Sequence, residues 1–487
     1  MSLDGSVIKR KGISGVIWTI IDRGGQHLII FLTGIWLARI LSPQDYGMIG
    51  ILSIFTYLGY AFQESGFTAA IVRKEKLVKE DLDVVFYMNV GIGTLSYLIL
   101  YWGVELIARF YAEPELIPLA RVVFLMFLFN AFSVVQNALL VRDMDFRTCT
   151  VINTSSMILS YAAALWAALE GWGPYAIAVQ IVSFALIRMI LLWTNGSWRP
   201  GLSFRKKSFD ELFSFSFKLL LTNILNTMAT RLFPSVIGKA YGTVSAGYYE
   251  NAQRWGNMPQ DFVAGTIANV SFPMISEVQR NETERVREVY RKSVRVTSFI
   301  VFPLFLGIMV CARDFIAYVL TEKWLPSVPF IMFICCAGIF NGLNTSNYNM
   351  LKAKGRSADI LRFEIIRNTM TIIAVLACIP LGVMWMMGAM VAVAVANYLF
   401  FSFRVDRMVK IRWMEHIFDI FPYAVLMLVS AAVAYPLSGT FPELHPLLLI
   451  AMQLAVMYTI YIGGGYLFGS RIVREIFQIL KRQKREA

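Results

Sequence analysis

The side chains best able to do chemistry in this sequence are charged residues inside long apolar segments. A charge at membrane depth costs about 2.5–3.5 kcal/mol on insertion scales, so such residues face the interior of a helix bundle or a wet cavity. Arg23, Lys218 and Arg254 are the cations that we expect to line one cavity. Arginine binds phosphate with paired donors, and lysine binds it as a point charge. These cations therefore predict a phosphorylated or acidic ligand, such as an amphiphile with a diphosphate head and a lipid tail.

Helical spacing extends this set of candidate residues. Lys218, Thr222, Asn226 and Thr230 are four residues apart and form one polar seam along a helix. The residues expected to bind the substrate are Arg23, Lys218, Arg254, Arg231, Asn226 and Asn257. The carboxylates that could carry a coupling proton or sodium ion are Glu64, Asp261 and Asp22.

Several of these charged residues could have a structural role instead of binding substrate or an ion. Asp22 could simply neutralise Arg23, and Glu250 is one helical turn from Arg254, so these charges could hold helices together. Arg231 could instead extend to the outer membrane interface. Three further charges are candidates for the cavity or for ion pairs between helices: Arg188, Glu364 and Arg367.

Long apolar helices must position these residues. Of the 487 residues, 57% are apolar and 16% are charged, and the mean hydropathy is +0.59. A soluble protein is about half apolar and a quarter charged. Since one span takes about 20 apolar residues, the sequence predicts an all-α polytopic membrane protein and excludes a soluble enzyme with a single anchor. The fourteen expected spans are 13–38, 47–71, 83–108, 116–141, 149–169, 174–194, 213–237, 245–276, 294–312, 325–351, 358–379, 381–403, 413–436 and 446–468.

The distribution of charge predicts the orientation of these spans. Most of the 45 lysines and arginines fall on one set of alternating loops, and the other loops carry few. An excess of lysine and arginine marks cytoplasmic loops, so we expect both termini in the cytoplasm. The net charge of +13 is then mainly a topology signal, and nucleic acid is not an expected partner.

The sequence predicts two pseudo-symmetric six-helix lobes followed by two C-terminal helices. The turn 42–47 and the following helix resemble the turn 242–247 and its following helix, which indicates an internal repeat. Repeated halves with a site between them are a common transporter plan. The expected domains are an N-lobe over 1–194, a cytoplasmic linker over 195–212, a C-lobe over 213–403, spans 13 and 14 over 404–468, and a basic cytoplasmic tail over 469–487.

Neither metal nor cofactor chemistry is expected. The five cysteines include no C-x-x-C pair, and no cluster of histidine and cysteine has the spacing of metal ligands. A polytopic enzyme would need a sizeable outer loop with acid and base residues. The expected outer loops are short, and His445 is their only histidine, so we do not expect an enzyme.

Several short stretches together resemble the polysaccharide exporters of the Wzx or colanic-acid-exporter type. These exporters belong to the multidrug/oligosaccharidyl-lipid/polysaccharide (MOP) superfamily. The resembling stretches run in order along most of the chain: Leu41 to Gly47, Glu64 to Phe67 with Arg73-Lys74, Tyr111 to Leu116, Arg142 to Arg147, Glu322 to Pro329, and Lys354 to Ser357.

The resemblance implies a bacterial inner-membrane flippase. Its substrate would be undecaprenyl-diphosphate-linked oligosaccharide, for lipopolysaccharide O-antigen or capsule, moved between leaflets by alternating access. Membrane lipids, a polysaccharide polymerase and a chain-length regulator are the expected partners. Two alternatives remain at this stage: a lipid II flippase, and a drug/cation antiporter of the MATE type.

Overall fold

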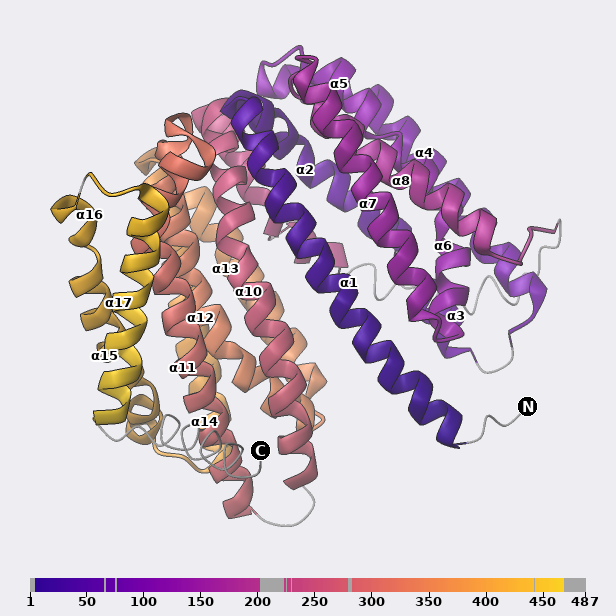
Figure 1. Cartoon of the computed structure of the whole chain (residues 1–487). Coiled ribbons are helices and arrows are strands. Elements are labelled where there is room, and N and C mark those ends of the chain that lie inside the picture. Colours follow the sequence, from indigo (N-terminus) through magenta and orange to yellow (C-terminus); the bar gives the residue numbers. More distant parts are fainter. Residues whose placement is uncertain are drawn as a thin grey trace. The chain divides into compact units, whose positions relative to one another are not determined.

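The computed structural model describes residues 5–64, 67–74, 77–201, 223–224, 226–228, 230–278, 283–441 and 443–467. Within these ranges all regular secondary structure is helical (Figure 1). The first part of the chain forms α1 (Gly5–Ile40), α2 (Pro43–Glu64), α3 (Phe67–Arg73), α4 (Lys79–Tyr111), α5 (Leu116–Val123), α6 (Met126–Arg142), α7 (Phe146–Leu169) and α8 (Tyr175–Asn195). Residues 230–241 form a further helical stretch. The remainder forms α10 (Thr243–Val278), α11 (Thr283–Phe315), α12 (Val328–Ala353), α13 (Ser357–Cys378), α14 (Val383–Val409), α15 (Trp413–Ala434), α16 (Leu437–Thr440) and α17 (Pro446–Leu467), with short π or 3-10 turns at Ile316–Leu320, Glu322–Ser327 and Ile379–Leu381.

The helices confirm an all-α, multi-pass membrane protein. Ten helices in the described ranges are long and apolar enough to cross a membrane. The expected span 47–71 includes the end of α2 and the start of α3, and the expected span 116–141 has two non-helical residues between α5 and α6. The total of fourteen spans and the two-lobe arrangement remain predictions.

The chain divides into two compact units, residues 1–247 and 248–487. In the first unit α4 packs on α6, and α7 packs on both α1 and α8. The first unit extends past the linker predicted at 195–212, much of which lies outside the described residues. The predicted lobe boundaries therefore remain a prediction.

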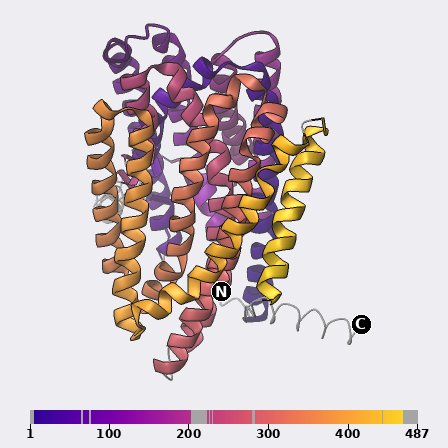
Figure 2. The same cartoon turned by 90° about the vertical axis from the view of Figure 1, so that its left-hand side faces the viewer.

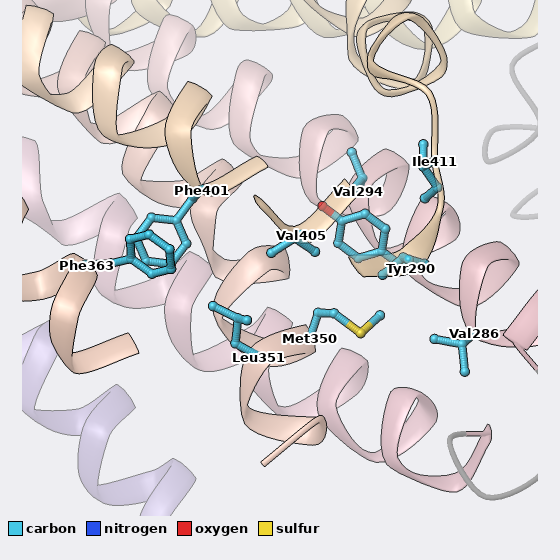
Figure 3. Close-up of a cluster of buried hydrophobic side chains, with 10 residues drawn as sticks. Val286, Tyr290, Val294, Met350, Leu351, Phe363, Phe401, Val405 and Ile411 are labelled. Atoms are coloured by element: carbon cyan, nitrogen blue, oxygen red, sulfur yellow. The ribbon is translucent and has the colours of Figure 1, made fainter. Parts of the chain in front are cut away.

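In the second unit, α11 packs against α12, α15 and α17, and α12 packs against α14. Figure 2 shows these helices, coloured from rose to yellow, running side by side. Near one end of α11, α12 and α14 they bury a cluster that includes Tyr290, Leu351, Phe363 and Phe401 (Figure 3). This cluster joins α11, α12, α13 and α14 within the second unit.

Candidate functional site

Three of the predicted site residues are described in the first unit. Asp22 on α1 is half-buried, and its Oδ1 accepts a hydrogen bond from Nε2 of Gln26 at 2.9 Å. Asn226 is exposed, and its backbone carbonyl accepts a hydrogen bond from the Thr230 hydroxyl at 2.9 Å. The Arg231 guanidinium lies 3.7 Å from the centre of the Tyr57 ring on α2. Tyr57 is a partner that the helical spacing of residues 218–230 did not reveal.

The other predicted site residues are distributed between the second unit and the undescribed part. Arg254 and Asn257 are both half-buried on α10. The backbones of Arg23, Glu64 and Asp261 are helical, but their side chains lie outside the described part of the chain, as does the whole of Lys218. A common cavity for these residues therefore stays a prediction.

The helical stretch 230–241 packs closely on α2. The Ser235 hydroxyl donates to the carbonyl oxygen of Ile51 at 3.2 Å. Gly238 also faces Ile51, since a Cβ built on this glycine would lie 2.5 Å from Cγ1 of Ile51. Only a glycine permits this approach, so the close packing that orients Arg231 over Tyr57 depends on the sequence at Gly238.

The two turns that resemble each other in sequence contact each other through their backbones. A Cβ built at Gly47 would lie 1.8 Å from the carbonyl oxygen of Thr243, and one built at Gly247 would lie 1.7 Å from that of Pro43. Each glycine thus packs on the first residue of the other helix. Pro43 and Gly47 differ in number from Thr243 and Gly247 by 200, so the contact is reciprocal, as expected for an internal repeat.

Polar groups fix the ends of both helices at this contact. Ser42 and Asp45 form a reciprocal cap on α2, since the Asp45 carboxylate accepts from the Ser42 backbone at 2.7 Å and the Ser42 hydroxyl accepts from the Asp45 backbone at 3.2 Å. Pro43 suits the first helical position. On α10, the Thr243 hydroxyl donates to Glu113 Oε1 at 2.5 Å. These bonds hold the two short turns in position.

Arg188 on α8 is a half-buried cation held by neutral groups. Its Nε donates to Oδ1 of Asn153 on α7 at 3.0 Å, and its Nη2 donates to Oδ1 of Asn137 on α6 at 2.9 Å. Among the described residues it forms no ion pair. The guanidinium is thus oriented by two amides while its charge is not neutralised by them. Arg188 is one of the candidates predicted from the sequence, whereas neither asparagine was predicted as its partner.

The cations at one end of α11 are arranged differently. Arg291 forms a paired contact with Asp419 on α15, Nε to Oδ2 at 2.7 Å and Nη2 to Oδ1 at 3.0 Å. Arg295 Nε donates to the same carboxylate at 2.6 Å, and Arg287 Nη2 donates to Glu415 at 2.7 Å. We name these five residues the α11–α15 ion-pair ladder. None of the five was singled out from the sequence, although the spacing of four residues on both helices was a signal for pairing.

Glu364 and Arg367, candidates for a cavity or for ion pairs between helices, pair within one helix. Arg367 Nη2 lies 2.5 Å from Glu364 Oε2, and both residues belong to α13. The link between helices is made instead by the Tyr348 hydroxyl of α12, which donates to Glu364. An interval of three residues brings side chains together on one helix face, which explains this local pairing.

Sequence comparison identifies relatives in polysaccharide biosynthesis. The model of a family described as "polysaccharide biosynthesis protein" matches residues 36–329. The teichuronic acid biosynthesis protein TuaB of Bacillus subtilis (strain 168) is 25% identical over 355 residues, which cover 72% of this chain and 73% of that protein. The lipopolysaccharide biosynthesis protein WzxC of Escherichia coli (strain K12) is 26% identical over 376 residues, 76% of this chain and 75% of the relative.

Structural comparison identifies the fold. A solved structure of the lipid II flippase MurJ in an inward closed conformation superposes with a TM-score of 0.74 at 14% identity, covering 93% of this chain and 99% of that one. An inward-facing multidrug resistance MATE transporter of the MOP superfamily has a TM-score of 0.62 at 14% identity, covering 79% and 96%. At this identity the likeness concerns the fold alone.

Proposed function

Because this chain belongs to the polysaccharide biosynthesis protein family and has the fold of MOP superfamily transporters, we propose that it flips an undecaprenyl-diphosphate-linked oligosaccharide. The movement runs from the cytoplasmic to the periplasmic leaflet of a bacterial inner membrane, and both termini lie in the cytoplasm. The names of TuaB and WzxC, which concern two different glycans, support a carrier lipid as the shared part of the substrate.

The observation that carries the proposal is Arg188. Its charge is held in an apolar helix by the amide oxygens of Asn137 and Asn153, with no ion pair among the described residues. Burying an uncompensated charge is costly unless a ligand compensates it. A diphosphate supplies acceptor oxygens and negative charge, and the guanidinium keeps donors for them. Arg188 thus joins Arg23, Lys218, Arg231 and Arg254 as a cation of the proposed cationic central cavity.

The remaining predicted residues have subordinate parts in this proposal. Asn226 and Asn257 offer amide hydrogen bonds to the head group or to the first sugars. Asp22, Glu64 and Asp261 are the candidate carriers of a coupling ion. A polysaccharide polymerase and a chain-length regulator act on the glycan after it has crossed, and are proposed partners on the outer side.

The proposed mechanism is alternating access between two repeated halves. The reciprocal contact of Gly47 with Thr243 and of Gly247 with Pro43 supports it. Two helix ends that meet through bare backbone can separate without removing large interlocked side chains. In this mechanism the contact closes the outer end while the substrate head enters from the cytoplasm, and it opens for release.

A flipping assay tests the function directly. The full chain is reconstituted in liposomes with undecaprenyl-diphosphate-linked oligosaccharide bearing a fluorescent sugar, and the label exposed to a membrane-impermeant quencher is followed with time. We expect flipping of this lipid and little flipping of labelled lipid II in a parallel set of liposomes. Efficient flipping of lipid II alone would assign the chain to the alternative flippase function. Export of a cationic dye without lipid flipping would assign it to the antiporter function.

A crosslink tests the mechanism separately. In a variant without the five native cysteines, cysteines at Gln44 and Ser245 join the two contacting turns when oxidised. We expect the crosslink to stop flipping and a reducing agent to restore it. Normal flipping with the crosslink complete would contradict the alternating-access mechanism but leave the substrate assignment intact.

A further inference from the structure

A basic pocket in the second unit is not used by the proposed transport mechanism. It lies between the adjoining ends of α12, α13 and α14, is open to the surface and has a volume of about 360 Å³. Arg356, Arg404, Arg407 and Asp359 line its rim. With three guanidinium groups and one carboxylate, the rim carries a net charge of about +2 at neutral pH.

The positive charges of the rim arginines are only partly compensated by carboxylates. Oδ2 of Asp359 lies 3.6 Å from Nη1 of Arg356, and its Oδ1 lies 3.9 Å from Nη1 of Arg362. The carboxylate therefore shares its charge between two cations. The Arg407 guanidinium lies 4.3 Å from the centre of the Phe403 ring, a contact that orients it without neutralising it. No ion pair joins Arg404 to any described residue, and the residue is exposed. Arg404 and Arg407 are three residues apart and share one face of α14.

The floor of the pocket is apolar. It is made by Leu351, Phe363 and Met408. Leu351 and Phe363 are only 3% and 6% exposed and belong to the buried cluster of the second unit (Figure 3). A cationic rim above an apolar floor suits an amphiphile better than a free anion, because only an amphiphile fills both.

The position of the pocket along its helices agrees with a membrane interface. Arg356 directly precedes α13, Leu351 is two residues before the end of α12, and Arg407 lies in the last turn of α14. The apolar bodies of these helices continue from there in one direction. Pockets of this kind between transmembrane helices bind the head groups of anionic lipids.

We propose that this pocket binds the phosphodiester head group of an anionic phospholipid, with the glycerol and upper acyl chain against Leu351, Phe363 and Met408. The Arg404 and Arg407 guanidinium groups take the phosphate oxygens, and Arg356 closes the rim. The paired donors of arginine match a phosphate in a way that lysine does not. The bound lipid is a resident of the second unit and not the transported substrate.

Native mass spectrometry of the full chain in detergent tests the proposal. Phosphatidylglycerol and phosphatidylcholine are added in equal amounts, and the dissociation constant of each is measured. We expect one phosphatidylglycerol to bind at least about tenfold more tightly than phosphatidylcholine, because a hydrogen-bonded charged contact is worth roughly a tenfold to hundredfold change in affinity. The Arg404→Ala/Arg407→Ala variant should lose this preference, and Arg404→Lys/Arg407→Lys should keep part of it.

A matched control removes two exposed arginines elsewhere in the second unit. Arg285→Ala/Arg313→Ala should retain the preference for phosphatidylglycerol, since both side chains are exposed and neither lines the pocket.

Equal binding of the two lipids by the wild type, or an unchanged preference in the alanine variant of Arg404 and Arg407, would overturn the proposal. Displacement of the lipid by inorganic phosphate alone would assign the pocket to a free anion instead. If the alanine variant proves unstable, Met408→Glu decides the question, because a carboxylate on the floor should repel the lipid.

Discussion

Arg188 and Arg291 are both half-buried arginines on long helices, yet their partners differ in kind. Arg291 faces Asp419, which is 4% exposed on its side chain and is shared with Arg295. Arg188 faces only the amide oxygens of Asn137 and Asn153 among the described residues. The ladder binds α11 to α15 with its charges largely compensated. The Arg188 site holds a cation in place and leaves its charge available.

The difference separates charges that stabilise the fold from charges that can bind a ligand. A carboxylate partner satisfies both the donors and the charge of a guanidinium. An amide partner satisfies donors only, so the site keeps an electrostatic attraction for an anion. A half-buried arginine on a helix therefore does not by itself predict a ligand site. Whether its partner is a carboxylate or an amide determines whether its charge remains available to a ligand.

The largest effect is expected from removing the shared carboxylate of the ladder. Asp419→Ala leaves Arg291 and Arg295 without their main partner, and breaking a buried pair in this way costs about 3–5 kcal/mol. Since both arginines keep some exposure, we expect the lower end of this range. Unfolding of the purified protein in detergent measures the loss, and flipping per folded molecule should stay within about twofold of the wild type, less than a 1 kcal/mol change.

A repaired variant provides the control for that prediction. Asp419→Leu combined with Arg291→Met and Arg295→Met removes all three charges and should recover most of the stability, because apolar residues of similar size often replace buried ion pairs well. A transport defect in Asp419→Ala at unchanged stability would show instead that the ladder takes part in substrate binding.

The second effect concerns transport and not stability. Arg188→Gln keeps a polar side chain between α6, α7 and α8 but removes the charge. We expect flipping to fall by roughly tenfold to a hundredfold, as a charged contact worth about 1.5–3 kcal/mol is lost, with a small change in the unfolding midpoint. Arg188→Lys should recover only part of the activity, since the lysine cannot bind both amides and the substrate in the same geometry. Equal losses of stability and activity in Arg188→Gln would make Arg188 a structural residue like Arg291.

The sequence predicted the helices well because long apolar runs determine them. The span expected at 358–379 corresponds to α13, which runs from Ser357 to Cys378. The interruption between α5 and α6 was not predicted, because Phe124 and Leu125 are as apolar as their neighbours and carry no turn signal. Asp22 and Gln26 are four residues apart, an interval that places both on one face of α1, where they form a hydrogen bond.

The surroundings of the site could be predicted only in part. Asn137 and Asn153 are 51 and 35 residues from Arg188, and neutral amides on separate helices produce no periodic pattern. The contact of Arg231 with Tyr57 was not predicted either, because the two residues are far apart in the sequence and lie on separate helices. By contrast, the resemblance between the turns 42–47 and 242–247 was visible in the sequence, because both turns carry polar residues and end in a glycine, Gly47 or Gly247.

The smallest effect is expected from converting the Arg188 site into a paired one. Asn153→Asp places a carboxylate where the amide oxygen now lies 3.0 Å from Nε of Arg188, so the guanidinium gains the kind of partner that Arg291 has. We expect stability to rise by about 1 kcal/mol or less, since a partly exposed pair contributes little. Flipping should nevertheless fall, because the new carboxylate competes with the diphosphate for the same cation.

The matched control is Asn153→Ala, which removes one hydrogen bond but leaves the charge of Arg188 available. This variant should flip the lipid faster than Asn153→Asp although it is less stable. If Asn153→Asp flips as fast as the wild type, neutralising Arg188 has no consequence for transport, and the distinction between amide-held and carboxylate-held arginines carries no functional meaning in this protein.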